Sequence, residues 1–300
     1  MPNNKSAHYQ KLLEKWTKKH EGLQREIFEK HKDAFEWLEN SSKQLAVGSI
    51  AGIFMLTNPI VPQIPASFSA NLSQEQAVDK RVFLIYDLKN VLPSDVRPLT
   101  LEEEAKVSEV LSRTFGIKVA GELSGKRLNS QYGYIGQEQH LARFPGDSMF
   151  SHFDTPEESY DFSKHGMAPG LGAFRYFSNS RGEMTQEDNL REKYYIAVQT
   201  FLSPGFNENV REYMEFYKYR KMLVVNPQNG KAVVADIADS GPAAWTGKQF
   251  GGSPEVMNWL GGEGYKKGKV VVFFVDDPEN KISLGPVEIN SELGSVIAQN

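Results

Sequence analysis

The first forty residues carry a hydrophobic pattern with the period of an α-helix. From Tyr9 to Leu38, apolar residues and two histidines recur in steps of three and four. Residues 1–43 hold nine Lys/Arg and seven Asp/Glu, so their charges nearly balance. This predicts an amphipathic helical arm over 1–43, with residues 9–38 as a surface for a partner helix. The shared stripe consists of Leu12, Trp16, His20, Leu23, Ile27, His31, Ala34 and Leu38.

An uncharged stretch follows between Lys43 and Glu75. We interpret residues 44–75 as an apolar anchor or signal segment with a proline-rich linker, because 45–62 just reaches the ~18 residues of a membrane span. Cleavage near Ser67 would make it a signal, and a buried core helix is the third alternative. Its lysine-rich flank is N-terminal, so a membrane-anchored or secreted chain would expose its C-terminal part outside the cytoplasm.

Residues 76–165 predict a small α/β region with long loops. The apolar run 81–86 is of strand type. Thr100 and Glu103 form a capping-box pattern, which predicts a helix of about four turns ending at Gly116.

The stretch 128–172 is rich in glycine, proline and aromatic residues, which is typical of an ordered functional loop. It contains nitrogen and oxygen ligands of the kind that zinc prefers, although their spacing matches no established zinc motif. One alternative function is therefore a metal-dependent hydrolase. Its candidate ligands are His140, His152, Asp154 and His165, and Glu138 lies in the same stretch.

Residues 193–286 are rich in strand patterns. Strands are expected at 194–201, 222–225 and 231–237, with the Asn229-Gly230 hairpin turn before the last. Ser253 and Pro254 begin a short helix, and the apolar run 270–275 reads as a buried strand.

Composition narrows the function classes. The 300-residue chain has a formal net charge of -4, which argues against nucleic acid as a partner. It has no cysteine, so disulfides, thiol catalysis and cysteine-bound metals are excluded. It also lacks a phosphate-binding glycine loop, a nucleophile elbow and an HExxH motif, and we predict no cofactor.

The order strand, Asn-Gly turn, valine-rich strand, Asp239-Ser240-Gly241-Pro242, helix and final valine-rich strand resembles the double-psi β-barrel of the rare lipoprotein A and expansin group. The resemblance covers about a third of the chain. It implies an α+β protein with a C-terminal six-stranded double-psi-like barrel, placed at 166–290, and a short tail at 291–300. The family's Ala-His element is replaced here by the stretch 215–221, and 243–246 is an unusual insertion.

The resemblance implies that Asp239 matches the acid used by the catalytic members. A carboxyl in a half-buried corner can act as the proton donor in glycan cleavage. The expected substrate-binding residues are Asp236, Gly241, Trp245, Tyr217 and Tyr219. The competing interpretation is a turn in which Asp239 accepts backbone N–H bonds.

The leading hypothesis is thus an envelope-facing protein that binds a cell-wall polysaccharide, peptidoglycan, with lytic transglycosylase cleavage by Asp239 as its sharper form. Its membrane contact would be the 45–62 segment. A non-catalytic scaffold, in which the barrel is structural and the 9–38 helix pairs with a partner, is an alternative alongside the metal-dependent hydrolase.

Overall fold

The computed structural model describes residues 69–290, with side chains from Lys80 onward, and all of them belong to one compact unit. The predicted arm at 1–43, the membrane segment at 45–62 and the tail at 291–300 lie outside the described residues. Between residues 69 and 290, no helix is both long and apolar enough to span a bilayer.

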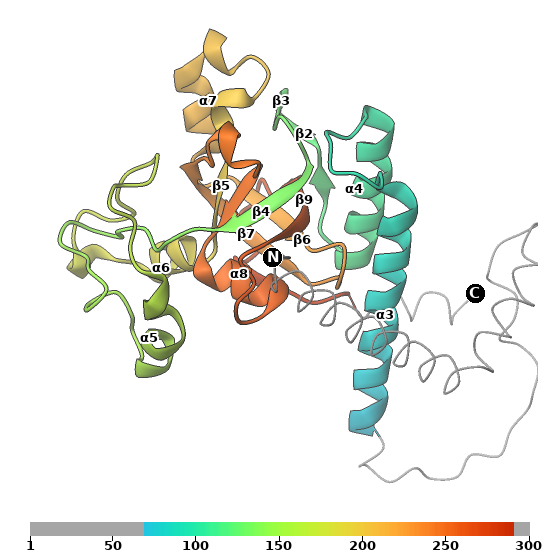
Figure 1. The fold of residues 1–300 in the computed structure, drawn as a ribbon, viewed down its shortest axis with the longest axis horizontal. Helices are drawn as coiled ribbons and strands as arrows, with labels where there is room; N and C mark the ends of the chain where they lie inside the picture. The colour runs from blue at the N-terminus through green and yellow to red at the C-terminus, as the bar shows by residue number, and fades with distance from the viewer. Residues whose placement is uncertain (1–68, 291–300) are drawn as a thin grey trace, which may run out of the picture. The chain divides into compact units, whose positions relative to one another are not determined.

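A closed six-stranded β-barrel forms the centre of the fold (Figure 1). Around the barrel the strands follow the order β4-β8-β5-β7-β6-β9, and β9 returns to β4. The β4–β8 and β5–β7 pairs are parallel, and the other four pairs are antiparallel. This architecture is compatible with a double-psi barrel. The strands are β4 (Tyr132–Gln137), β5 (Tyr195–Val198), β6 (Lys221–Val225), β7 (Ala232–Ser240), β8 (Phe250–Gly252) and β9 (Lys267–Val275).

Short strands extend this barrel. β1 (Val119–Ala120) pairs with β9, and β10 (Gly285–Val287) pairs with β7. A separate two-stranded ribbon is formed by β2 (Glu122–Leu123) and β3 (Lys126–Arg127). The first barrel strand, β4, lies well before residue 166, where the sequence predicted the barrel to begin. The predicted boundary was too late because glycine-rich β4 lacks the valine pattern of the later strands.

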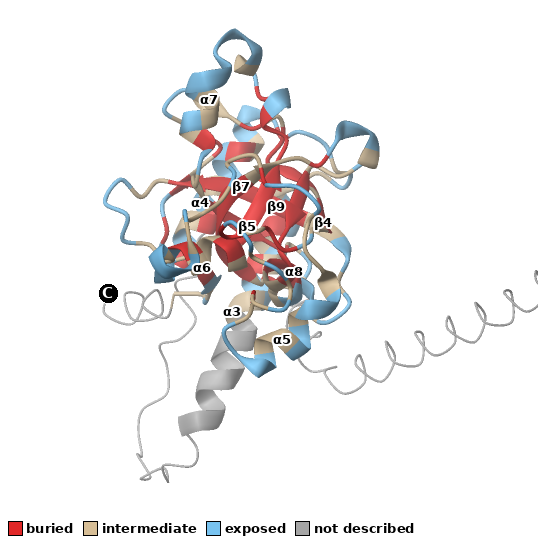
Figure 2. Cartoon of the chain, turned by 90° about the vertical axis from the view of Figure 1, so that its left-hand side faces the viewer, coloured by how far each residue is buried: buried red, intermediate tan, exposed pale blue. Residues whose placement is uncertain are grey.

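Alternation along the strands separates the barrel interior from its outer faces. Ile196 and Val198 of β5 belong to the interior cluster, whereas Tyr195 and Ala197 point outward. The short helix α8 (Pro254–Gly261) adds Val256 to the interior. Its predicted Ser253 N-cap is confirmed: the Ser253 hydroxyl accepts the Val256 N–H at 3.1 Å. Figure 2 shows the buried residues concentrated in the strands.

Helices α3 (Ser69–Val91) and α4 (Leu101–Phe115) cover one outer face of the barrel (Figure 1). The predicted capping box at Thr100 and the Gly116 stop are both present. The predicted strand at 81–86 is wrong, because this run lies within α3. Leu84 and Leu88, four residues apart, are buried against the barrel, whereas Phe83 is 67% exposed. The apolar run thus supplies one helix face, not a strand.

Three further helices lie in the second half of the chain. They are α5 (Pro156–Phe162), α6 (Gln186–Lys193) and α7 (Val210–Tyr217). In Figure 1, α5 and α6 lie on the side of the barrel away from α3 and α4. The strands predicted at 194–201, 222–225, 231–237 and 270–275 are confirmed, with shifted ends, as β5, β6, β7 and β9.

Candidate functional site

Asp239 lies at the end of β7 with one carboxylate oxygen anchored and the other free. Its Oδ1 accepts the backbone N–H groups of Ala173 and Ser240, both at 2.8 Å. Oδ2 makes no hydrogen bond within the described residues, and the side chain is half-buried. The turn interpretation from the sequence is therefore correct for Oδ1. Oδ2 remains available to a ligand.

A second carboxyl group, that of Glu138, lies on the same outer face of the barrel. Glu138 directly follows β4, and its side chain occupies the space that a Cβ on Gly251 would fill. Gly251 and Asp239 both pair with Ala197, one from each side, so all three project to the same face. Two strand spacings separate Gly251 from Asp239, roughly 10 Å between Cα atoms. The small residues Ala197 and Gly251 thus lie between the carboxyl groups of Glu138 and Asp239.

The surroundings of Glu138 shift its pKa in the direction of the neutral acid. Burial raises the pKa of Glu138, and the nearby negative charge of Asp239 adds to this effect. The ammonium of Lys248, 3.7 Å from Oε1, opposes the rise in pKa without cancelling it. Glu138 still has 31% of its side chain exposed, so it can exchange protons with a ligand. A carboxyl group with a raised pKa beside an anchored carboxylate suits acid–base chemistry.

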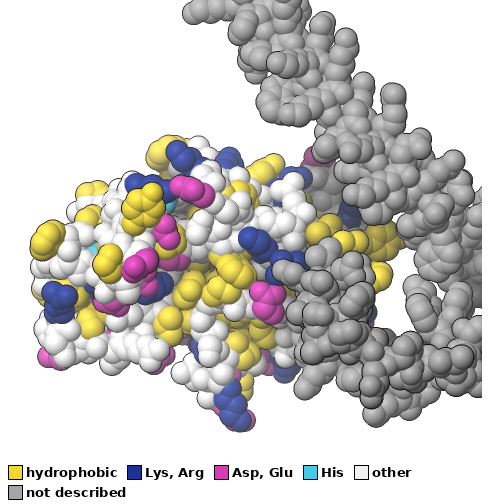
Figure 3. All heavy atoms as spheres, turned by 90° about the horizontal axis from the view of Figure 1, so that it is seen from below, with side chains coloured by type: hydrophobic (Ala, Val, Ile, Leu, Met, Phe, Trp, Pro, Cys, Tyr) yellow, Lys and Arg dark blue, Asp and Glu magenta, His cyan; other side chains and the backbone are white. Residues whose placement is uncertain are grey.

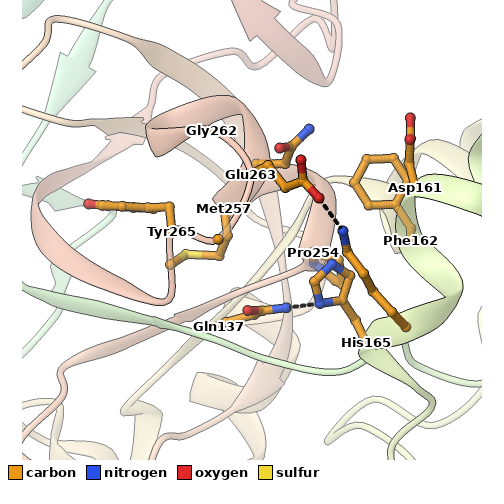
Figure 4. Close-up of a pocket in the computed structure, with 12 residues that line it drawn as sticks. Gln137, Asp161, Phe162, His165, Pro254, Met257, Gly262, Glu263 and Tyr265 are labelled. Carbon is orange, nitrogen blue, oxygen red and sulfur yellow. Dashed lines mark hydrogen bonds and ion pairs between the residues drawn. The ribbon is translucent and has the colours of Figure 1, made fainter.

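An open cleft of about 580 Å³ leads away from Glu138. Three lysines and one further acid line it, namely Lys164, Lys248, Lys266 and Glu263. It shares His165 and Gln137 with the adjoining pocket shown in Figure 4, where the His165 ring points toward Gln137 and Lys164 pairs with Glu263 at 2.7 Å. Burial, followed by the charge of Lys164, lowers the pKa of His165, so this imidazole is neutral at pH 7.

The loop between β7 and β8 presents the predicted aromatic residue. Trp245 lies in a 3-10 turn, Ala244–Thr246, and is 88% exposed. Gln199 holds the loop closed, because its side-chain amide donates to the carbonyls of Pro242 and Lys248 at 2.9 and 3.1 Å. A Cβ on Gly241 would meet open space, so a ligand can approach the backbone there.

Three of the expected substrate-binding residues make internal contacts and do not form an open platform. Asp236 is 2% exposed and pairs with Arg191 at 3.3 Å. Tyr217 is fully buried in the barrel interior. Tyr219 is half-buried, with Phe177 stacked at 5.7 Å and the Arg191 guanidinium 4.5 Å from its ring. Aromatic spacing in the sequence did not distinguish these packing residues from a platform.

The histidines of the alternative metal site are only partly brought together. His140 and His152 are buried with ring centroids 4.7 Å apart, and their acidic neighbour is Glu192 of α6. Asp154 is exposed and His165 lies in the cleft. A hydrolase site made of His140, His152, Asp154 and His165 is therefore not formed.

Sequence reasoning missed Glu138 and Lys248 as site residues and Glu192 as the partner of the histidines. The pattern of 128–172 predicts a loop, so no expected strand marked the position of Glu138, and Glu192 lies among charged residues typical of a solvated helix face.

No family model, curated protein or solved structure matches this chain. On the face seen in Figure 3, hydrophobic side chains are interspersed with charged groups of both signs.

Proposed function

We propose that this protein binds a cell-wall glycan, peptidoglycan, across the barrel face that carries Glu138 and Asp239, and cleaves it as a lytic transglycosylase. The observation that carries the proposal is the pairing of a raised-pKa carboxyl with an anchored carboxylate over the small residues Ala197 and Gly251. The barrel topology, compatible with the double-psi barrels that the sequence resembles, supports it.

The sequence led us to expect one catalytic acid, Asp239. We now propose that two carboxyl groups, those of Glu138 and Asp239, share the proton transfers. Glu138 donates its proton to the glycosidic oxygen as the bond from the anomeric carbon to that oxygen breaks. Asp239 Oδ2 accepts the proton of the sugar's own C6 hydroxyl, whose oxygen forms the new bond to the anomeric carbon. The product is a 1,6-anhydro sugar, no water is consumed, and proton exchange with solvent restores both carboxyl groups.

The cleft supplies the remaining recognition. Its three lysines suit the carboxylates of lactyl and peptide substituents on the glycan. Trp245, exposed six residues after Asp239, can stack on a sugar ring. The envelope location rests on the 45–62 segment and remains part of this proposal.

Co-sedimentation of the full-length protein with purified peptidoglycan tests the binding step. We expect the wild type to sediment with the polymer, and Trp245→Ala to bind several-fold more weakly. The matched control is Glu109→Gln, an exposed residue of α4, which should bind like the wild type. Equal retention of all three proteins on cellulose and peptidoglycan, or no retention, would favour the scaffold alternative.

A further inference from the structure

A second polar cluster lies behind the wall of the candidate site, in the buried contact between the 138–152 loop and α6. Its members are His140, His152 and Glu192, which are 0%, 4% and 1% exposed. Their ligand atoms all lie within 4.8 Å of one another. Unlike Glu138, none of these three residues lines the cleft.

The donor atoms are spaced like the ligands of a small divalent cation. Oε2 of Glu192 lies 3.1 Å from Nε2 of His152, and Oε1 lies 3.3 Å from Nδ1 of His140. Ligands at about 2.0–2.1 Å around a tetrahedral ion are roughly 3.3 Å apart. Two imidazole nitrogens and a carboxylate are also a donor set that zinc favours.

Asp147 binds the ring nitrogen of His152 that faces away from the proposed ion, as carboxylates usually do behind metal-bound histidines. Asp147 Oδ2 is 2.9 Å from His152 Nδ1, on the side of the ring away from Glu192. Arg143 in turn holds Asp147 through its backbone N–H and its Nε, at 3.0 and 3.1 Å. Such a carboxylate fixes the ring orientation and leaves Nε2 to face the ion.

The weak bonding of His140 leaves its Nδ1 open to a stronger ligand. The ring is fully buried, and Nδ1, the nitrogen that faces Glu192, makes only a long contact of 3.3 Å to Oε1. A metal ion at Nδ1 would replace this contact with a ligand bond.

We propose that His140, His152 and Glu192 bind one divalent cation of the zinc class as a structural site. Cation binding displaces the proton between His152 Nε2 and Glu192, which passes to solvent, and the ring proton of His140 shifts from Nδ1, which binds the ion, to Nε2. The ion ties the 138–152 loop to α6. Leu141 of that loop donates its N–H to Glu192 at 3.0 Å and lies against Gly172, next to the Ala173 N–H that anchors Asp239. The site would therefore stiffen the wall on which Asp239 depends.

The test is calorimetric titration of the full-length, chelator-stripped protein with ZnCl₂, together with its melting temperature with and without zinc. We expect one site of micromolar or tighter affinity in the wild type and a higher melting temperature with zinc. His140→Gln should weaken that site by about 100-fold or more, whereas Asp147→Asn should weaken it about 10- to 100-fold. His165→Gln, a histidine outside the cluster, is the matched control and should bind like the wild type.

Wild-type protein without a site tighter than about 100 µM, or a His140→Gln variant that binds as tightly as the wild type, would overturn the proposal. If His140→Gln does not fold, the visible absorption spectrum of the wild type loaded with Co²⁺ tests the metal site instead. Intense bands of four-coordinate Co²⁺ would support the proposed site, and a weak spectrum of octahedral Co²⁺ would overturn the proposal. None of these readouts depends on glycan cleavage, so the two proposals fail separately.

Discussion

Asp236 makes the stability of this protein depend on pH in an unusual direction. It is 2% exposed, and its Oδ1 has no hydrogen-bond partner. Burial raises the pKa of Asp236 to about 7, although the charges of Arg191 and Lys221 oppose the rise. The reference pKa of an aspartate is 3.8. Between these two values the native state keeps a proton that the unfolded state has lost, so stability from this group falls as pH rises.

The size of the effect follows from the same two pKa values. Integrating the difference in bound protons between the unfolded and native states from pH 5 to pH 8 gives a loss of about 2.5 kcal/mol of stability from Asp236 in the wild type. Asp236→Asn keeps the shape of the neutral acid and removes its titration. Integrating upward from the fully protonated acid, we expect the substitution to stabilise the protein by about 1.5 kcal/mol at pH 5 and by about 4 kcal/mol at pH 8.

Urea unfolding followed by circular dichroism, at pH 5 and pH 8 on both proteins, measures this difference. Other groups titrate as well, but their contributions cancel in the comparison of variant and wild type. Asp95→Asn, at an exposed position, is the control and should show no pH-dependent difference. A destabilisation by Asp236→Asn that is larger at pH 8 than at pH 5 would mean that the Arg191 ion pair outweighs the cost of burial.

Three further predictions concern the site and the core. Glu138→Gln should leave glycan binding within about threefold but lower cleavage at least ~100-fold in a product assay, and unchanged cleavage would remove Glu138 from the mechanism. Gly251→Ala places a Cβ 2.4 Å from the Glu138 carboxylate, so it should reduce cleavage by displacing that flexible side chain while the melting temperature changes little. Tyr217→Phe loses hydrogen bonds to Ser203 Oγ at 2.7 Å and to the Arg127 carbonyl at 3.0 Å, and should cost about 1–3 kcal/mol in urea unfolding without weakening peptidoglycan sedimentation.

The sequence predicted correctly those caps and turns that depend only on residues close together in the chain. The capping box at Thr100, the Asn229-Gly230 turn and the Ser253 cap each involve residues within a few positions of one another, and all three form as expected. The apolar run at 81–86 was misread because a short stretch cannot distinguish a strand from one face of a longer helix. Burial of Leu84 and Leu88 against the barrel decides that choice, and it depends on distant residues.

The candidate site was predicted in part for the same reason. Asp239 was found because its Gly-Pro corner is a local motif. Glu138 joins it only through the pairing of β4 with β8, of β8 with β5 and of β5 with β7, which no sequence period encodes. Likewise, the aromatic pattern around Tyr217 and Tyr219 fits core packing as well as a binding platform, and only the structure shows that the first is in the core and the second is covered.

The most direct test of the central claim is mass spectrometry of the soluble products released from purified peptidoglycan by the full-length protein. The account predicts 1,6-anhydro sugar ends with the wild type and with Glu109→Gln, and their loss with Asp239→Asn and with Glu138→Gln. Reducing ends in place of anhydro ends would contradict the lytic mechanism. Equal products from Asp239→Asn and the wild type would contradict the site itself.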